Sequence, residues 1–166
     1  MKIEIVYASE KYFQSFYEAL SQVAKERIYI EMVEAPPYEK VVGFQQDNIS
    51  KNAAVYYAVQ GDRVVGWCDI FSSNNPRMSH RGGLGMGLLP EFRGLGLGSK
   101  LLKSALEHAQ KIGLEKVELH VYSSNISAIA LYKNFGFEQE GLLKKYRKLD
   151  GQDFDCLAMA KFFNKE

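Results

Sequence analysis

The alternation of apolar and polar residues predicts the first elements of the chain. Residues 2–7 alternate in this way and predict a strand. Ser9 is a typical helix N-cap, and the apolar positions that follow through Val23 predict a helix. Pro36-Pro37 then indicates a loop, and we expect a second helix to run from there to about Lys51.

The middle of the chain has the shorter apolar runs that are typical of strands. Residues 53–59 and 64–71 flank Gly61-Asp62, which is a strong hairpin signal. A turn-rich loop over 72–77 follows, and the apolar run 84–89 predicts a buried strand.

The remaining elements continue the alternation of helix and strand. They are a helix over 97–112, a strand over 116–122, a helix over 125–135, and a hairpin with strands over 137–147 and 153–162 that turns at Asp150-Gly151. The resulting order predicts an α/β (α+β) fold with a mixed, mostly antiparallel seven-stranded sheet and helices on both faces. A length of 166 residues fits one domain over 1–166.

Composition and charge narrow the class of protein. A net charge of +1 gives no overall field that would attract nucleic acid or an acidic membrane surface, so neither partner is expected. Two cysteines make no disulfide framework and have no metal-binding spacing, so no metal is expected. The N-terminus lacks a signal peptide, and no apolar run reaches 18 residues, which favours a cytoplasmic protein.

A glycine-rich run is the strongest chemical signal in the sequence. Residues 81–100 contain seven of the fourteen glycines and connect the strand over 84–89 to the start of a helix. Unshielded backbone N–H groups and the helix dipole favour an anion at such a turn, so we expect a ligand that carries phosphate. The spacing fits neither a mononucleotide P-loop nor a dinucleotide-binding fingerprint.

Two motifs resemble one known family. Arg93-x-x-Gly96-x-Gly98, after a Pro-x-Phe strand exit, resembles the acetyl-CoA pyrophosphate loop of the GNAT superfamily of N-acetyltransferases. Residues 119–125 (LHVYSSN) and 130–137 (ALYKNFGF) resemble the strand-to-helix segment of the same family. The resemblance covers residues 84–140 and implies the single-domain GNAT fold, with acetyl-CoA as co-substrate and a primary amine as acceptor.

The resemblance also implies which residues bind acetyl-CoA. Leu88 and Leu89 fall where the strand backbone pairs with pantetheine and where a backbone N–H could polarise the thioester carbonyl. Asn125 matches a side chain that contacts the arm of coenzyme A. The residues that match the pyrophosphate loop are Arg93, Gly94, Leu95, Gly96, Leu97, Gly98 and Ser99.

Two residues are the candidates for acid–base chemistry. Tyr132 matches a tyrosine beside the coenzyme A sulfur and could protonate the leaving thiolate, although a packing tyrosine fits the same pattern. His120 matches a glutamate taken as the base in ribosomal-protein alanine acetyltransferases, and a histidine suits proton transfer at neutral pH. A packed or hydrogen-bonded histidine on the sheet is the alternative.

One departure from the family leaves the base open. Many small-amine relatives carry a glutamate at the position that aligns with Gly83, where this chain has no carboxylate. His80 could substitute for it, Glu31 and Glu34 could bind a cationic amine, and Asp69 is a further carboxyl on a neighbouring strand.

These observations predict an N-acetyltransferase that acts on a primary amine by direct attack in a ternary complex. A small molecule such as an amino acid or polyamine is favoured. A protein N-terminal or lysyl acetyltransferase acting on a peptide amine is an alternative, and so is a non-catalytic acyl-CoA-binding regulatory module. The last hairpin could pair between subunits, which would allow a homodimer.

Overall fold

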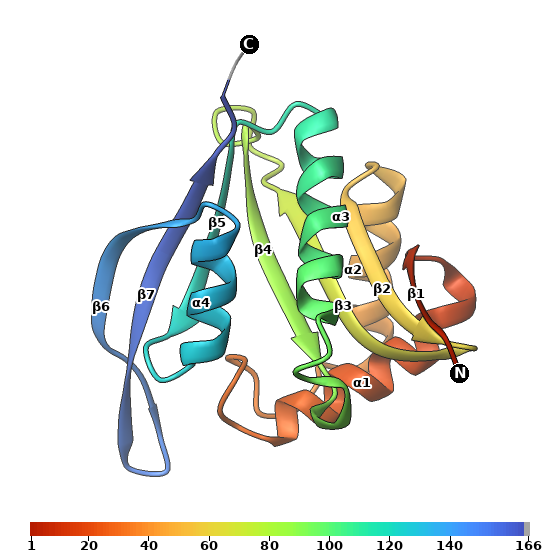
Figure 1. Cartoon of the computed structure of the whole chain (residues 1–166), viewed down its shortest axis with the longest axis horizontal. Coiled ribbons are helices and arrows are strands. Elements are labelled where there is room, and N and C mark those ends of the chain that lie inside the picture. Colours follow the sequence, from red (N-terminus) through yellow and green to blue (C-terminus); the bar gives the residue numbers. More distant parts are fainter. Residues whose placement is uncertain (165–166) are drawn as a thin grey trace. The chain divides into compact units, whose positions relative to one another are not determined.

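The computed structural model describes residues 1–164, and over these residues the chain forms one seven-stranded mixed sheet and four α-helices (Figure 1). The elements are β1 (Ile3–Tyr7), α1 (Phe13–Lys25), α2 (Tyr38–Ser50), β2 (Ala54–Gln60), β3 (Arg63–Ser72), β4 (Arg81–Leu88), α3 (Leu97–Lys111), β5 (Lys116–Tyr122), α4 (Ile126–Asn134), β6 (Glu138–Leu149) and β7 (Gln152–Phe162). The strand order in the sheet is β1-β2-β3-β4-β5-β7-β6. This architecture confirms the predicted fold class.

The chain divides into two compact units, and strand β4 supplies residues to both. Unit 1 comprises Met1–Phe71 and Leu84–Gly113, and unit 2 comprises Ser72–Gly83 together with the chain from Leu114 onward. The single domain expected over 1–166 stays a prediction.

Unit 1 has helices on both faces of its strands. Neighbouring residues of a strand point to opposite faces of the sheet. Tyr57 of β2 stacks on Phe16 of α1, whereas the adjacent Tyr56 is hydrogen-bonded to His108 of α3. Figure 1 shows the same arrangement, with α3 in front of these strands and α2 behind them. Helices α1 and α2 therefore cover one face of these strands, which we call the α1/α2 side, and α3 covers the opposite face.

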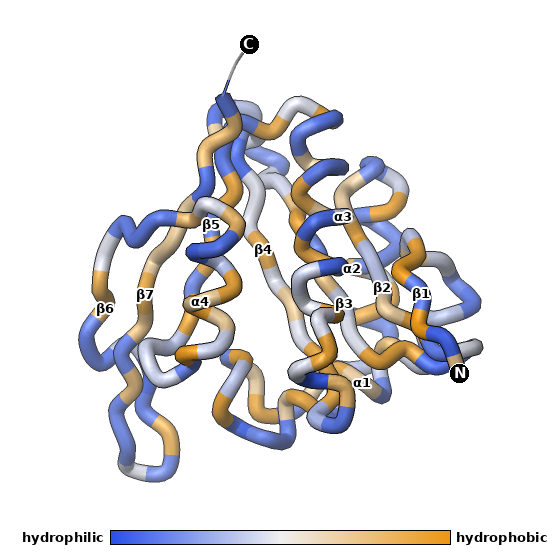
Figure 2. Tube along the Cα trace, in the orientation of Figure 1, coloured by the Kyte–Doolittle hydropathy of each residue, from blue (hydrophilic) through white to orange (hydrophobic). Residues whose placement is uncertain are grey.

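Unit 2 is built around β5 and β7. The first three residues of β4 pair with β5 in parallel, beginning with Arg81 opposite Lys116, and β7 pairs antiparallel with both β5 and β6. Figure 2 shows hydrophilic residues along most of β6, in agreement with the exposed positions that dominate this strand. The predicted turn at Asp150-Gly151 is confirmed, and both residues have positive φ angles of 52° and 75°.

Two predicted boundaries are wrong for local reasons. The strand expected over 84–89 runs from Arg81 to Leu88, because its early glycines pair with β5 although they carry no apolar signal. The first helix is preceded by a 3-10 turn at Glu10–Tyr12, and the Ser9 side chain forms no capping hydrogen bond. By contrast, the predicted strand 116–122 coincides with β5.

Candidate functional site

The predicted pyrophosphate loop lies in unit 1 between β4 and α3. A 3-10 turn at Pro90–Phe92 follows the strand, and α3 begins at Leu97. Gly94 and Gly96 have φ angles of 76° and 79°, a left-handed conformation that glycine adopts without a steric penalty. Nothing approaches within 4 Å of the place where a Cβ would lie on either residue, so the loop surface is open.

The start of α3 fits an anion. The N-cap residue is Gly96, which has no side chain to accept hydrogen bonds from the helix. The first N–H groups of a helix have no acceptor within the helix, and the helix dipole adds a partial positive charge there. Leu95 is 60% exposed beside them. The backbone of residues 94–99 can therefore hold a pyrophosphate group without help from a cationic side chain.

Arg93 is engaged within unit 1. Its Nη1 and Nη2 atoms donate to Glu26 at 2.9 and 2.6 Å, and its Nε and Nη2 atoms donate to the Leu88 carbonyl at 3.0 and 2.8 Å. The guanidinium also lies 4.4 Å from the ring centroid of Tyr29. We call Arg93, Glu26, Tyr29 and the Leu88 carbonyl the Arg93 clamp. Hydrogen bonding to Glu26 raises the pKa of Arg93.

The Arg93 clamp changes what Arg93 is expected to do. Its side chain fastens the end of α1 and the segment after it to the end of β4, so it holds the loop in place. A direct contribution of Arg93 to acetyl-CoA binding stays a prediction. Sequence reasoning missed Glu26 and Tyr29, because no local pattern connects residues so far apart in the chain, and Glu26 lies 67 positions before Arg93.

The end of β4 bears on which backbone N–H could polarise the thioester carbonyl. The Leu89 N–H donates to the Val65 carbonyl at 2.9 Å, and Leu89 is only 2% exposed. The Leu89 N–H is therefore already engaged, and polarisation of the thioester carbonyl by the Leu88 N–H stays a prediction. A Cβ on Gly87 would lie 2.4 Å from the Trp67 ring, so glycine at this position accommodates a buried indole.

Unit 2 carries the other predicted site residues. The Asn125 side chain accepts a hydrogen bond from the Ala128 N–H at 3.3 Å and so caps α4. Tyr132 is 7% exposed, and its ring packs 5.6 Å from that of Phe137. His120 is exposed on β5, and its Nδ1 atom lies 3.3 Å from the Tyr146 hydroxyl. Contacts of these three residues with acetyl-CoA or acceptor stay predictions.

The secondary candidates differ in burial. His80, Glu31 and Glu34 are exposed. Asp69 is 7% exposed and is hydrogen-bonded to Gln45 of α2. It is the only buried acidic residue among residues 1–164.

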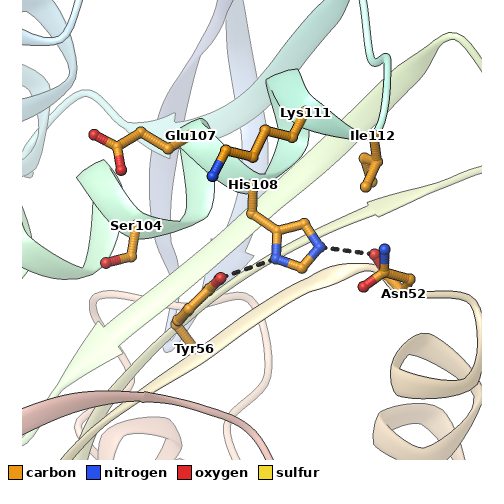
Figure 3. A pocket seen from close by; sticks show the side chains of 7 residues that line it. All are labelled: Asn52, Tyr56, Ser104, Glu107, His108, Lys111 and Ile112. Atoms are coloured by element: carbon orange, nitrogen blue, oxygen red, sulfur yellow. Dashed lines mark hydrogen bonds between the residues drawn. The ribbon is translucent and has the colours of Figure 1, made fainter.

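A pocket of about 320 Å³ lies elsewhere in unit 1, at the C-terminal end of α3 (Figure 3). It is lined by Asn52, Tyr56, Ser104, Glu107, His108, Lys111 and Ile112. Both ring nitrogens of His108 are already engaged, by the Tyr56 hydroxyl and the Asn52 carbonyl, each at 2.9 Å. The pocket contains none of the predicted site residues, and it lies at the opposite end of α3 from the glycine-rich loop.

Within residues 1–164, no group of three or more histidine, cysteine, aspartate or glutamate side chains could hold a metal ion. Over the same residues, every helix is too short or too polar to cross a membrane.

Comparison with known proteins gives a consistent result. Residues 13–137 match the model of the acetyltransferase (GNAT) family. The L-amino acid N-acetyltransferase of Escherichia coli (strain K12) is 30% identical over 87% of this chain and 91% of its own length. A GNAT acetyltransferase structure from Streptococcus pneumoniae has a TM-score of 0.91 at 25% identity, covering 98% of this chain and all of that one. A phosphinothricin acetyltransferase from Sinorhizobium meliloti, solved with acetyl-CoA, has a TM-score of 0.90 at 20% identity, covering 98% and 89% of the two chains.

Proposed function

Because the chain belongs to the GNAT acetyltransferase family, and is therefore an acyltransferase that uses acetyl-CoA, we propose that it acetylates the primary amine of a small molecule. A free amino acid is the first acceptor to test. The observation that carries the proposal is the uncapped start of α3 after an open glycine-rich loop. The relative from Escherichia coli, named as an L-amino acid N-acetyltransferase, supports the choice of acceptor.

The donor-binding residues of unit 1 act through their backbone. Bound acetyl-CoA supplies an activated acetyl group, and the N–H groups of residues 94–99 hold its pyrophosphate at the positive end of α3. The Arg93 clamp keeps this loop in position relative to the end of β4. Fixing the donor in this way supplies part of the rate acceleration, because both reactants are then held in register.

Proton transfer is the chemical problem that the acceptor poses. A lysine-like amine with a pKa of about 10.4 is only about one part in 2500 neutral at pH 7, so deprotonation costs roughly 4.6 kcal/mol. Our proposal gives Tyr132 the protonation of the departing thiolate. His120 is one candidate for accepting the proton of the amine.

The proposal is tested by measuring coenzyme A release with acetyl-CoA and a panel of amino acids, polyamines, aminoglycosides and short peptides. We expect release that depends on an amino acid, with the N-acetyl product confirmed by mass spectrometry. Turnover with peptides alone would contradict the small-molecule acceptor and favour a protein acetyltransferase. Tight acetyl-CoA binding without turnover on any amine would contradict catalysis and favour a regulatory binding module.

A further inference from the structure

The α1/α2 side of unit 1 has a buried polar cluster beneath helix α2. The buried residues of α2 are Val41, Gln45 and Asn48, and the two amides are only 1% and 5% exposed. A helix that packs on a sheet usually buries aliphatic side chains, because a buried amide is costly unless it is hydrogen-bonded. The Nδ2 group of Asn48 has no hydrogen-bond partner within residues 1–164. This arrangement is not what packing alone would select.

Gln45 is oriented toward the carboxyl group of Asp69. The Tyr57 hydroxyl donates to the Gln45 Oε1 atom at 2.7 Å, which directs the Gln45 amide nitrogen to the other side. That nitrogen lies 3.5 Å from Asp69 Oδ2, the outer limit of a hydrogen bond. Within residues 1–164, no lysine or arginine pairs with Asp69. The carboxyl group is thus buried without a cationic partner, and hydrogen bonds alone offset the cost of burying its charge.

The other carboxyl oxygen lies against the backbone of β4 at Gly85. Gly85 is half-buried, and a Cβ on it would lie 3.0 Å from Asp69 Oδ1. Because Gly85 has no side chain, Oδ1 can lie directly against the β4 backbone, which hydrogen-bonds to the carboxyl group three residues before Leu88. This strand leads into the glycine-rich loop that binds the donor.

We propose that Asp69 is the proton acceptor for the acceptor amine, in preference to His120; this rests on the proposed N-acetyltransferase function. The protonated amine gives one proton to Asp69 Oδ1, directly or through one water molecule. The neutral nitrogen then uses its lone pair to form the C–N bond to the acetyl carbon, and the C–S bond breaks. The sulfur leaves with its electron pair, and the second proton lost by the nitrogen balances the proton that converts this thiolate to a thiol. Gln45 positions the carboxyl group by binding Oδ2.

The electrostatics support this role. Burial raises the pKa of Asp69 to about 6, partly offset by hydrogen bonds from Gln45 and from the backbone of Asp69 and Gly85. Such a group is more basic than an ordinary carboxylate and is still mostly ionised at neutral pH. The titratable groups that couple to it are Tyr57 and Cys68, and burial raises both of their pKa values, so both stay neutral between pH 5 and 8. Gln45 of α2 does not titrate.

The first test is the pH dependence of kcat/KM from pH 5 to 9, with the amino acid that gives the fastest turnover. The wild-type profile should show an acid limb with a midpoint near 6. Asp69→Asn should lose about 10²- to 10⁴-fold in kcat at pH 8, and the limb should disappear. An unchanged limb in Asp69→Asn that disappears in His120→Gln would overturn the assignment and leave the proposed function intact. A wild type inactive on every amine would instead contradict the proposed function.

A second test separates chemistry from packing. Gly85→Ala places a methyl group 3.0 Å from Asp69 Oδ1 and should lower kcat while leaving the acetyl-CoA Kd within about twofold. Gly43→Ala, where nothing lies within 4 Å, is the matched control and should keep wild-type kcat. An alkoxyamine analogue of the acceptor, neutral at pH 7, should rescue most of the Asp69→Asn loss. Equal loss with this analogue would show that Asp69 only packs, and the proposal would fail.

Discussion

At the scale of single residues, Arg93 holds the proposed donor loop in place through its hydrogen bonds to Glu26 and to the Leu88 carbonyl. A lysine at this position keeps the charge but cannot form the bidentate pair with Glu26 or the paired bonds to the Leu88 carbonyl. We expect Arg93→Lys to lower the free energy of unfolding by about 1–3 kcal/mol and to raise the KM for acetyl-CoA several-fold.

Denaturant titration and steady-state kinetics measure these two effects. The matched control is Arg63→Lys, because Arg63 donates to Glu91 at 2.8 Å in an exposed pair on the same unit. Exposed pairs contribute little, so the control should change stability by less than about 1 kcal/mol. Equal effects of the two variants would contradict a special role for the Arg93 clamp.

The burial of Asp69 leads to a prediction about the free energy of unfolding that does not depend on activity. Its pKa in the folded chain is about 6, above the ordinary value near 3.9 in an unfolded chain, because the buried carboxylate is desolvated. The folded state is therefore stabilised as the pH falls through 6 toward 4. We expect the free energy of unfolding of Asp69→Asn to exceed that of wild type by up to about 3 kcal/mol at pH 8. A weaker hydrogen bond to Gln45 in the variant would reduce this difference. The difference should vanish near pH 4, where Asp69 is protonated in both the folded and the unfolded wild type.

Urea unfolding of the two proteins across this pH range provides the measurement. The difference between them isolates Asp69, because the other carboxyl groups titrate in both. A variant that is less stable than wild type at every pH would show that the carboxylate stabilises the fold. Higher stability together with lower activity is the trade-off expected of a functional group held in an unfavourable environment.

Among single residues, the sequence predicted those whose conformation depends on their immediate neighbours in the chain. The glycine-rich run predicts a turn before the helix that starts at Leu97, and Gly94 and Gly96 have left-handed φ angles in that turn. The partners of Arg93 could not be predicted, because Glu26 lies 67 residues away and its pairing depends on how α1 packs. The burial of Asp69 was hidden for the same reason, since its environment comes from α2 and β4.

Among the elements, helix α4 offers the sharpest prediction. Its N-cap is Asn125, the same residue that resembles a coenzyme A contact. Asn125→Ala removes the cap and should cost about 0.5–2 kcal/mol of stability, whereas Asn125→Asp preserves a capping oxygen and should cost little. If the amide also donates to coenzyme A, both variants should raise the KM for acetyl-CoA. Thermal unfolding and donor titration separate the two roles, and an unchanged KM in Asn125→Asp would contradict the ligand contact.

Elements with a strong period were predicted well and elements without one were not. Helix α3 alternates apolar and charged faces, and the prediction over 97–112 differs from Leu97–Lys111 by one residue. The first residues of β4 are Arg81 and two glycines, which carry no such period and pair with β5 through their backbone. Backbone pairing leaves no mark in an apolar pattern, so the start of this strand could not be placed.

For the whole molecule, donor binding should appear as added stability. A ligand that binds only the folded chain stabilises it by mass action, by about 2.7 kcal/mol at a concentration of 100 times its Kd. We expect acetyl-CoA to raise the unfolding temperature in this concentration-dependent way, and acetyl-pantetheine, which lacks the pyrophosphate, to be much weaker. Equal stabilisation by a fragment without pyrophosphate would contradict the role of the loop at residues 94–99.

The number and type of elements were predictable, but their lateral order was not. The alternation along the chain indicated seven strands and a mixed sheet, and both are observed. The sheet places β7 between β5 and β6, an order in which strands adjacent in sequence are not all adjacent in space. Side-chain periodicity reports which residues are buried, and it contains no information on which strand lies beside which.

The rate at which each cysteine reacts with a thiol reagent reports the opening of the unit that contains it. Cys68 belongs to unit 1 and Cys156 to unit 2, and both thiols are buried at 0% and 1% exposure. Burial also raises the pKa of Cys68, which suppresses the reactive thiolate. Labelling by a thiol reagent must therefore wait for local or global opening. Mass spectrometry that resolves the two sites would reveal whether the units open together, with equal labelling rates, or one before the other.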